Sequence, residues 1–240
     1  MSLAGAFARL LLKAPRFGKL KVKNWAKVLA KETSGMGLSA EALKVGLDNV
    51  AAREPAFARA LEIAGYPEPR IRERGAVTMM RTIVGQQVSV AAAASMWRKF
   101  EAFAGSEPEP ARVLAASFDE LRACGLSRQK QGYLRSLCEL TLAGEMNFSD
   151  IPTDDEEAIA QLTRIKGIGR WSAEIYLLFA EGRPDIWPAG DLAVQAGLHK
   201  LLGLEERPSE KRTRELAESW RPHRGALAIF TWHCYNNSAL

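Results

Sequence analysis

The chain has 240 residues, of which 47% are hydrophobic and 25% charged, as in an ordinary soluble protein with one large domain or two small ones. Its net charge of +5 fits a polyanionic partner, although many basic proteins bind none. Three scattered cysteines exclude a disulfide framework, a zinc pair and an iron–sulfur cluster, and they predict reduced thiols in the cytosol. No apolar run reaches the length of a membrane span.

The first 31 residues contain eight Lys or Arg residues and no Asp or Glu. Such a segment can be a nucleic-acid-binding arm, a targeting-like segment or a poorly ordered extension. We favour the extension and give the targeting segment the least weight.

Helical periodicity dominates the rest of the chain, and no convincing alternating strand pattern accompanies it. Ser39 and Ser89 can each cap a helix, and Gly65 with Pro67 ends the helix expected at 53–64. The sequence therefore predicts an all-α protein. In chain order, helices are expected at 39–49, at 53–64, at two stretches of 77–103 on either side of 85–89, and at 111–123, 128–143, 154–163, 170–180, 192–202, 210–219 and 225–235.

The most informative segment runs from Leu162 to Glu174 and contains the tight turn Gly167-Ile-Gly169. Glycines let backbone amides approach a partner closely, and amides at the start of a helix form a natural phosphate site. A lone carboxylate, Asp191, follows in the segment 187–194. A turn that binds phosphate, placed ahead of one carboxylate, indicates chemistry on a nucleic acid.

Two other interpretations of this turn compete with that one. Gly167, Gly169 and Ser172 nearly match a dinucleotide-binding fingerprint, with Asp191 at about the right distance for a ribose contact. That fingerprint requires a preceding strand, whereas 154–163 is predicted to be helical. The glycines can also form a simple turn between two helices, without any ligand.

Four ordered motifs carry a family resemblance. The segment 162–180 resembles the helix-hairpin-helix of the base-excision DNA glycosylase superfamily, and 187–194 resembles the segment that carries its characteristic aspartate. Segments 85–92 and 221–232 are similar to parts of the DNA-3-methyladenine glycosylase II family. The similarity covers about 39–236 in order, and leaves 1–38 outside it. The β-rich N-terminal domain of some members has no counterpart here.

The resemblance makes Asp191 the candidate catalytic carboxylate. A fixed anion stabilises the positive charge that develops on the sugar when an N-glycosidic bond breaks, and it can orient or deprotonate the attacking water. From sequence alone, an isolated aspartate at this position is expected to cap the helix that begins at Leu192. Both roles are compatible, because capping positions the carboxylate.

Trp171 occupies the position at which strand-cutting family members have a Schiff-base lysine, and Lys166 is out of register for that role. The resemblance therefore implies a monofunctional enzyme without lyase activity. Trp232 corresponds to the family's base-stacking tryptophan, whose indole attracts a cationic alkylated base, although sequence alone favours a core role. Trp187 and Trp171 are the weaker candidates for the base pocket.

The resemblance also implies the DNA contacts. Gln87 corresponds to the side chain that fills the gap left by a flipped base, while a turn-capping glutamine is the alternative. A structural Na⁺ or K⁺ is expected at the hairpin, and no other cofactor is expected to be required. The expected cation ligands are the carbonyls of Thr163, Ile165 and Ile168. The expected phosphate contacts are Gly167, Gly169, Arg170, Lys166 and Arg224, with Arg164 as an auxiliary contact that, like the other basic residues, can equally be a solvated charge.

These inferences predict two helical subdomains with a cleft between them. Residues 39–76 and 187–240 would form the subdomain with the catalytic aspartate, and 77–186 would carry the wedge loop and the hairpin. The expected function is hydrolysis of the N-glycosidic bond of flipped alkylated bases, of the 3-methyladenine or 7-methylguanine type, in duplex DNA during base-excision repair. A glycosylase for another damaged or mismatched base and an inactive DNA-binding module remain alternatives. The protein is expected to be a monomer that binds no membrane, in the cytoplasm with the nucleoid of a bacterium or in a eukaryotic nucleus.

Overall fold

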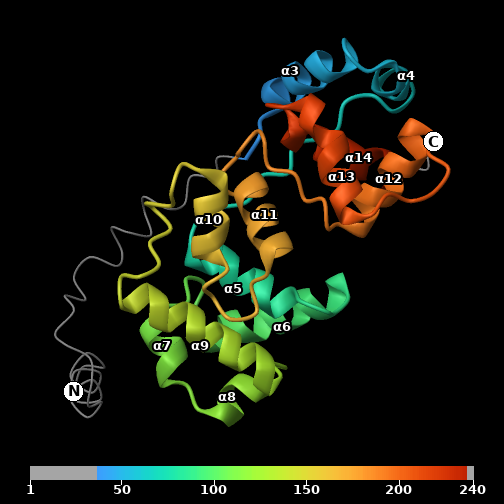
Figure 1. The fold of residues 1–240 in the computed structure, drawn as a ribbon. Helices are drawn as coiled ribbons and strands as arrows, with labels where there is room; N and C mark the ends of the chain where they lie inside the picture. The colour runs from blue at the N-terminus through green and yellow to red at the C-terminus, as the bar shows by residue number, and fades with distance from the viewer. Residues whose placement is uncertain (1–36, 237–240) are drawn as a thin grey trace.

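The computed structural model describes residues 37–236, so the basic segment 1–31 lies outside the described residues. The described chain is all-α, as predicted, and contains no strand within 37–236. Among these residues, no helix is both long and apolar enough to span a bilayer. The helices are α3 (Ala40–Ala51), α4 (Pro55–Ala64), α5 (Ala76–Gly85), α6 (Val90–Ala104), α7 (Pro110–Ala115), α8 (Phe118–Ala123), α9 (Arg128–Leu142), α10 (Asp155–Leu162), α11 (Arg170–Phe179), α12 (Leu192–Leu202), α13 (Glu210–Ala217), the 3₁₀ helix η2 (Glu218–Trp220) and α14 (Arg224–Asn236) (Figure 1).

Side-chain caps explain where several helices begin. The Oγ atoms of Ser39, Ser89 and Ser127 accept hydrogen bonds from backbone amides in the first turns of α3, α6 and α9. The carboxylate of Asp154 accepts two such bonds at the start of α10. Each cap satisfies amides that have no partner inside the helix, and thereby fixes the first residue of that helix.

The single helix expected at 111–123 is wrong, because this segment forms the two short helices α7 and α8. Ala116 is extended, and Ser117 begins α8 with a capping box in which its side chain and that of Glu120 bond each other's backbone amides. The sequence Ser-x-x-Glu is the known signal for this arrangement. The capping box therefore outweighs the continuous helical pattern.

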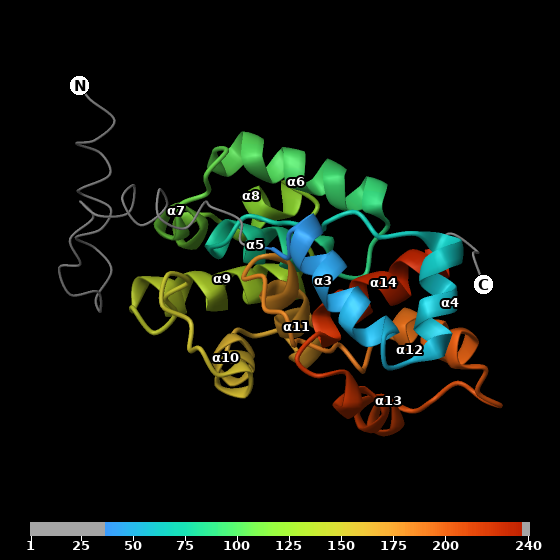
Figure 2. The ribbon, with the colours of Figure 1, turned by 90° about the horizontal axis from the view of Figure 1, so that it is seen from above.

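The helices pack in two groups joined by α11. At one end, α14 packs on α3 and α12, and α3 packs on α4; at the other end, α9 packs on α5 and α7, and α5 packs on α6 (Figure 1). Figure 2 shows α11 near the middle of the molecule, with α9 and α10 on one side and α12 and α14 on the other. All residues of α11 from Ser172 to Phe179 are buried. This central helix holds the hairpin turn at its first residue in a fixed position.

Candidate active site

Asp191 is the N-cap of α12. Its Oδ1 atom accepts hydrogen bonds from the amides of Ala193 at 2.9 Å and Val194 at 3.0 Å. The capping role expected from sequence is therefore present. The cap fixes the orientation of the carboxylate relative to α12.

Two indoles from other helices hold the same carboxylate. Trp171, in the first turn of α11, donates its Nε1–H to Asp191 Oδ2 at 2.8 Å, and Trp232, on α14, donates to Oδ1 at 3.1 Å. Among residues 37–236, no basic side chain forms an ion pair with Asp191. Four N–H donors thus hold an anion without neutralising it. Such preorganised dipoles are suited to fixing a carboxylate beside a reacting centre.

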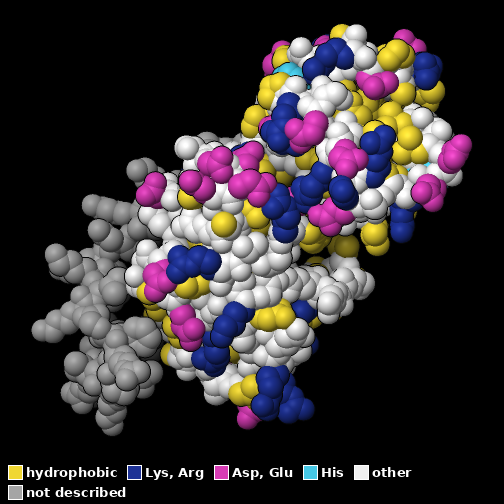
Figure 3. All heavy atoms as spheres, in the orientation of Figure 1, with side chains coloured by type: hydrophobic (Ala, Val, Ile, Leu, Met, Phe, Trp, Pro, Cys, Tyr) yellow, Lys and Arg dark blue, Asp and Glu magenta, His cyan; other side chains and the backbone are white. Residues whose placement is uncertain are grey.

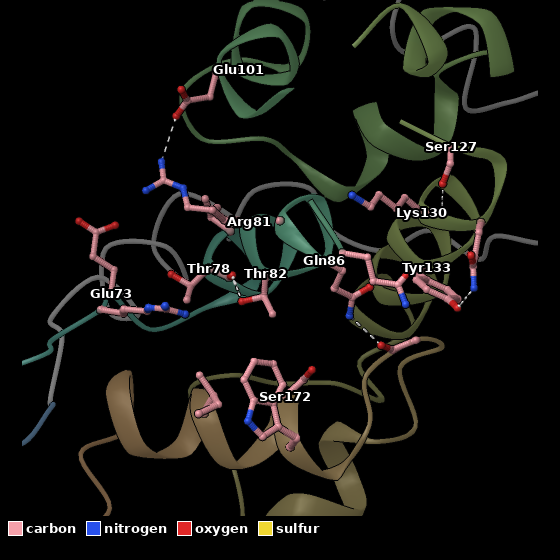
Figure 4. Close-up of a pocket in the computed structure, with 18 of the residues that line it drawn as sticks. Glu73, Thr78, Arg81, Thr82, Gln86, Glu101, Ser127, Lys130, Tyr133 and Ser172 are labelled. Atoms are coloured by element: carbon pink, nitrogen blue, oxygen red, sulfur yellow. Dashed lines mark hydrogen bonds and ion pairs between the residues drawn. The ribbon is translucent and has the colours of Figure 1, made fainter. Parts of the chain in front are cut away.

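Trp171 connects this carboxylate to a cavity of about 1120 Å³. This residue is 47% exposed and forms part of the cavity wall together with Ser172 and Ile175 of α11. The opposite wall comes from Thr78, Arg81 and Thr82 of α5, and the end near the hairpin comes from Gln86, Gln87, Lys130 and Tyr133 (Figure 4). Asp191 itself does not line this cavity between α5 and α11, but it is hydrogen-bonded to Trp171, which does.

The loop between α5 and α6 borders this cavity beside the hairpin. Gln87 is exposed and has a φ of 54°, in the left-handed region that a residue other than glycine rarely adopts. The preceding residue, Gln86, donates its Nε2–H to the carbonyl oxygen of Gly167 at 2.8 Å (Figure 4). Sequence reasoning missed Gln86, since nothing in a Gln-Gln pair indicates which side chain turns toward the hairpin.

The hairpin turn has the close backbone approach that its glycines predicted. Gly167 has a φ of 80°, and a Cβ atom there would lie 2.2 Å from Cδ2 of Tyr133. The amide of Lys166 donates to Oγ of Ser136 at 3.1 Å, which fixes the turn to α9. Gly169 begins α11 and has no atom within 4 Å of its Cβ position. The start of α11 is therefore open on the side of Gly169.

Of the hairpin's basic side chains, Lys166 is exposed, whereas Arg170 is engaged by two glutamates. Arg170 donates to Glu156 at 2.8 Å and to Glu174 at 3.0 Å, and the hydrogen bond with Glu156 raises its pKa. Burial raises the pKa of Glu174, although Arg214 and Arg170 act in the opposite direction. These ion pairs join α10, α11 and α13, so the guanidinium of Arg170 has a structural role. Its backbone amide remains a candidate phosphate contact.

Two predicted site residues belong elsewhere. Trp187 is 3% exposed, donates to the carbonyl oxygen of Thr213 at 3.1 Å and packs against Trp220, so the prediction that it lines the base pocket is wrong. Arg224 pairs with Asp185 at 2.8 Å and Glu218 at 3.2 Å. The Arg224 guanidinium is therefore engaged in ion pairs at the start of α14 and is not free for the expected phosphate contact.

Trp232 also differs from its expected role. Its ring packs against Phe179 at a centroid distance of 5.6 Å, and the guanidinium of Arg70 lies 5.7 Å from its centroid. It does not line the cavity. Its indole N–H donates to Asp191, while its ring contacts Phe179 and Arg70 and not the cavity.

The carbonyls expected to hold a monovalent cation belong to Thr163, Ile165 and Ile168, which all lie in the turn between α10 and α11. The Ile165 carbonyl accepts one hydrogen bond, from the Ile168 amide at 3.0 Å, and keeps a second lone pair. Oxygen donors of this kind suit a hard cation such as Na⁺ or K⁺. Within 37–236 no group of three or more His, Cys, Asp or Glu side chains could hold a metal ion.

Comparisons with known proteins identify the family of the chain. The family model for the HhH-GPD superfamily base excision DNA repair protein matches residues 80–222. DNA-3-methyladenine glycosylase 1 of Schizosaccharomyces pombe is 34% identical over 163 residues, which are 64% of this chain and 69% of that protein. DNA-3-methyladenine glycosylase 2 of Escherichia coli is 28% identical over 188 residues, or 72% and 64%.

Two solved structures are similar to the fold. The S. pombe 3-methyladenine DNA glycosylase in complex with abasic DNA has a TM-score of 0.70 at 28% identity, over 81% of this chain and 98% of that one. The DNA-3-methyladenine glycosidase of Bacillus halodurans has a TM-score of 0.73 at 28% identity, over 81% and 90%. The chain belongs to the HhH-GPD superfamily of base excision DNA repair proteins.

Proposed function

We propose that this protein is a monofunctional DNA glycosylase that hydrolyses the N-glycosidic bond of flipped alkylated bases in duplex DNA, as part of base-excision repair. The carrying observation is the Asp191 carboxylate, which has no ion pair within residues 37–236 and is held by two indoles, those of Trp232 and of Trp171 in the cavity wall. Relatives named DNA-3-methyladenine glycosylases support alkylated bases as the substrate.

The distribution of donors indicates which oxygen acts. Oδ1 accepts three hydrogen bonds, from Ala193, Val194 and Trp232, whereas Oδ2 accepts one, from Trp171. Because a carboxylate has about four lone-pair sites in all, two on each oxygen, Oδ2 keeps the free capacity. This oxygen stabilises the sugar cation or accepts a proton from the attacking water. Water adds to the sugar, the base leaves, and an abasic site remains.

The other predicted residues have supporting roles in this proposal. Gln87 enters the gap left by the flipped base, and its strained backbone at the cavity edge supports that role. The amides of Gly167, Gly169 and Arg170, with the Lys166 side chain, bind a phosphate of the damaged strand. A Na⁺ or K⁺ bound by the turn carbonyls would add positive charge there.

The two groups of helices correspond, in this proposal, to two subdomains: 39–76 with 187–240, and 77–186. The packing of α14 on α3 and of α9 on α5 supports that division. The protein acts as a monomer and at the location of the DNA: the nucleoid of a bacterium or the nucleus of a eukaryote.

A panel of damaged duplexes tests the function. The wild-type protein should release free methylpurine from methylated duplex DNA and leave duplexes containing uracil or hypoxanthine intact. Release from the uracil or hypoxanthine duplex alone would replace the proposed substrate. Binding to all the duplexes without release would make the protein a DNA-binding module.

Borohydride trapping tests monofunctionality. Trp171 stands where a Schiff-base lysine would be needed, and the buried Lys130 of the cavity wall donates to the carbonyl of Val84 at 2.8 Å. Reduction during turnover should therefore leave no covalent protein–DNA adduct on a denaturing gel. A trapped adduct would contradict the absence of lyase activity.

A further inference from the structure

The connection between α4 and α5 is held firmly against α11. The amide of Arg72 donates to the carbonyl oxygen of Phe179 at 2.9 Å, and the amide of Gly75 donates to the Tyr176 hydroxyl at 2.9 Å. Arg74 forms an ion pair with Glu181 at 2.8 Å. Three arginines occur in this connection, and only Arg74 is neutralised by an acid within the described residues.

The other two arginines lie on the aromatic rings beside Asp191. The guanidinium of Arg70 is 5.7 Å from the ring centroid of Trp232, and that of Arg72 is 5.3 Å from the centroid of Phe179. Both arginines are exposed, and Arg72 also lines the cavity. Glu73 lines the cavity as well, but within 37–236 it forms no ion pair with either arginine (Figure 4).

Of the arginines in this connection, Arg72 therefore lies at this end of the cavity and Arg70 lies on the neighbouring Trp232 ring, and neither forms an ion pair within residues 37–236. Desolvation by the surrounding protein groups lowers the pKa of Arg72 although part of its side chain is exposed, and the like charges of Arg70 and Arg81 lower it further. Arginine stays protonated despite such effects. An anion placed here would relieve the repulsion, whereas a cationic alkylated base would increase it. A phosphate therefore fits this cluster better than the damaged base does.

The cavity has Arg72 and the hairpin at its two ends. Glu73, next to Arg72 in the chain, lies at one end, and Gln86 and Tyr133 lie at the other end, beside Gly167 (Figure 4).

Oδ2 of Asp191 is held by Trp171, two residues after Gly169. Oδ1 is held by Trp232, whose ring lies against Arg70. Asp191 is thus linked to the start of α11 through Trp171 and to Arg70 through Trp232. A DNA strand laid along the cavity would meet the hairpin amides at one end and Arg72 at the other.

We propose that Arg70 and Arg72 form a second phosphate-binding point, which contacts the damaged strand on the other side of the flipped nucleotide from the hairpin. This inference rests on the proposed function, because a flipped nucleotide over Asp191 is what defines the two sides. Two phosphate contacts that flank one nucleotide hold the strand while the base leaves the stack.

The salt dependence of binding tests the proposal. The probe is a duplex with an uncleavable abasic-site analogue, and its Kd is measured against salt concentration for the wild type, Arg70→Gln, Arg72→Gln and the double variant. Each lost phosphate contact should reduce the slope of log Kd against log salt by about one. Arg59→Gln is the matched control, because Arg59 is an exposed arginine of α4 outside the cavity. That control should keep the wild-type slope.

Two results would overturn the proposal. One is a wild-type slope for the double variant, with folding verified by its Tm. The other is a wild-type slope for Arg72→Gln together with a changed ratio of its excision rates for cationic and neutral lesions. That result would make Arg72 a contact of the base and not of a phosphate. Failure of the proposed function is separate, since it would appear as no base release by the wild-type protein whatever the slopes.

Discussion

At the residue scale, Asp191 is both the cap of α12 and the candidate catalytic carboxylate, two roles that the sequence allowed but could not relate to each other. Its capping bonds to Ala193 and Val194 follow from its place before a helix, and the sequence predicted them. The bonds from Trp171 and Trp232 could not be predicted, because they depend on how α11 and α14 meet α12. Periodicity distinguishes a buried tryptophan from an exposed one, but it does not give the direction of an indole N–H.

Replacing Trp171 with Phe should lower the single-turnover excision rate about tenfold. The change removes one hydrogen bond to an ionised group, worth about 1.5 kcal/mol, from the oxygen assigned to catalysis. The Tm should change little, because Trp171 is half exposed. Trp220→Phe is the matched control: it lies outside the cavity, and its Nε1 has no hydrogen-bond partner. Equal rates for both variants would show that the Trp171 bond is unimportant.

At the element scale, the hairpin was predicted from its glycines, and the structure gives the two glycines different roles. Gly167 is required by the fold, since it has a positive φ and lies against Tyr133. Gly169 leaves open space beside the start of α11. The sequence alone does not distinguish the roles of the two glycines, because the contact of Gly167 is with Tyr133 of α9, a distant part of the chain. The bond from Gln86 to Gly167 was invisible for the same reason.

Alanine at each glycine should separate folding from binding. Gly167→Ala should lower the free energy of unfolding by at least about 1 kcal/mol, from the left-handed backbone alone, and by more through the clash with Tyr133. Gly169→Ala should leave the Tm near that of the wild type and weaken DNA binding, because the added methyl faces the space where a phosphate would approach. Thermal unfolding and Kd for a duplex measure the two effects. Normal binding by a folded Gly169→Ala protein would argue against a phosphate at this turn.

At the scale of the whole molecule, helical patterning was enough to predict an all-α chain and most of its helices. The central position of α11 was not predicted, because the burial of Ser172 to Phe179 depends on long-range contacts, such as those of Phe179 with Trp232 of α14 and of Tyr176 with Gly75 before α5. The net charge of +5 was also a weak guide to the DNA-binding surface. On the face in Figure 3, basic and acidic side chains are interleaved, so the excess charge does not by itself mark a DNA surface.

The three thiols report on the integrity of the whole fold. Burial raises the pKa of Cys138 to about 12 and that of Cys234 to about 11, and it also raises the pKa of Cys124. At pH 8 the thiolate fraction is therefore small, and the folded protein should react with DTNB far more slowly than the denatured protein, in which all three thiols should react. Rapid labelling of a thiol under native conditions would contradict this packing.

The catalytic role of Asp191 is tested most directly by the single-turnover release of methylpurine by Asp191→Asn. Asparagine caps a helix about as well as aspartate, so the variant should keep its Tm and its affinity for DNA. Because it lacks the negative charge, its excision rate should fall by at least about 100-fold. A folded Asp191→Asn protein that releases the base at the wild-type rate would contradict the account.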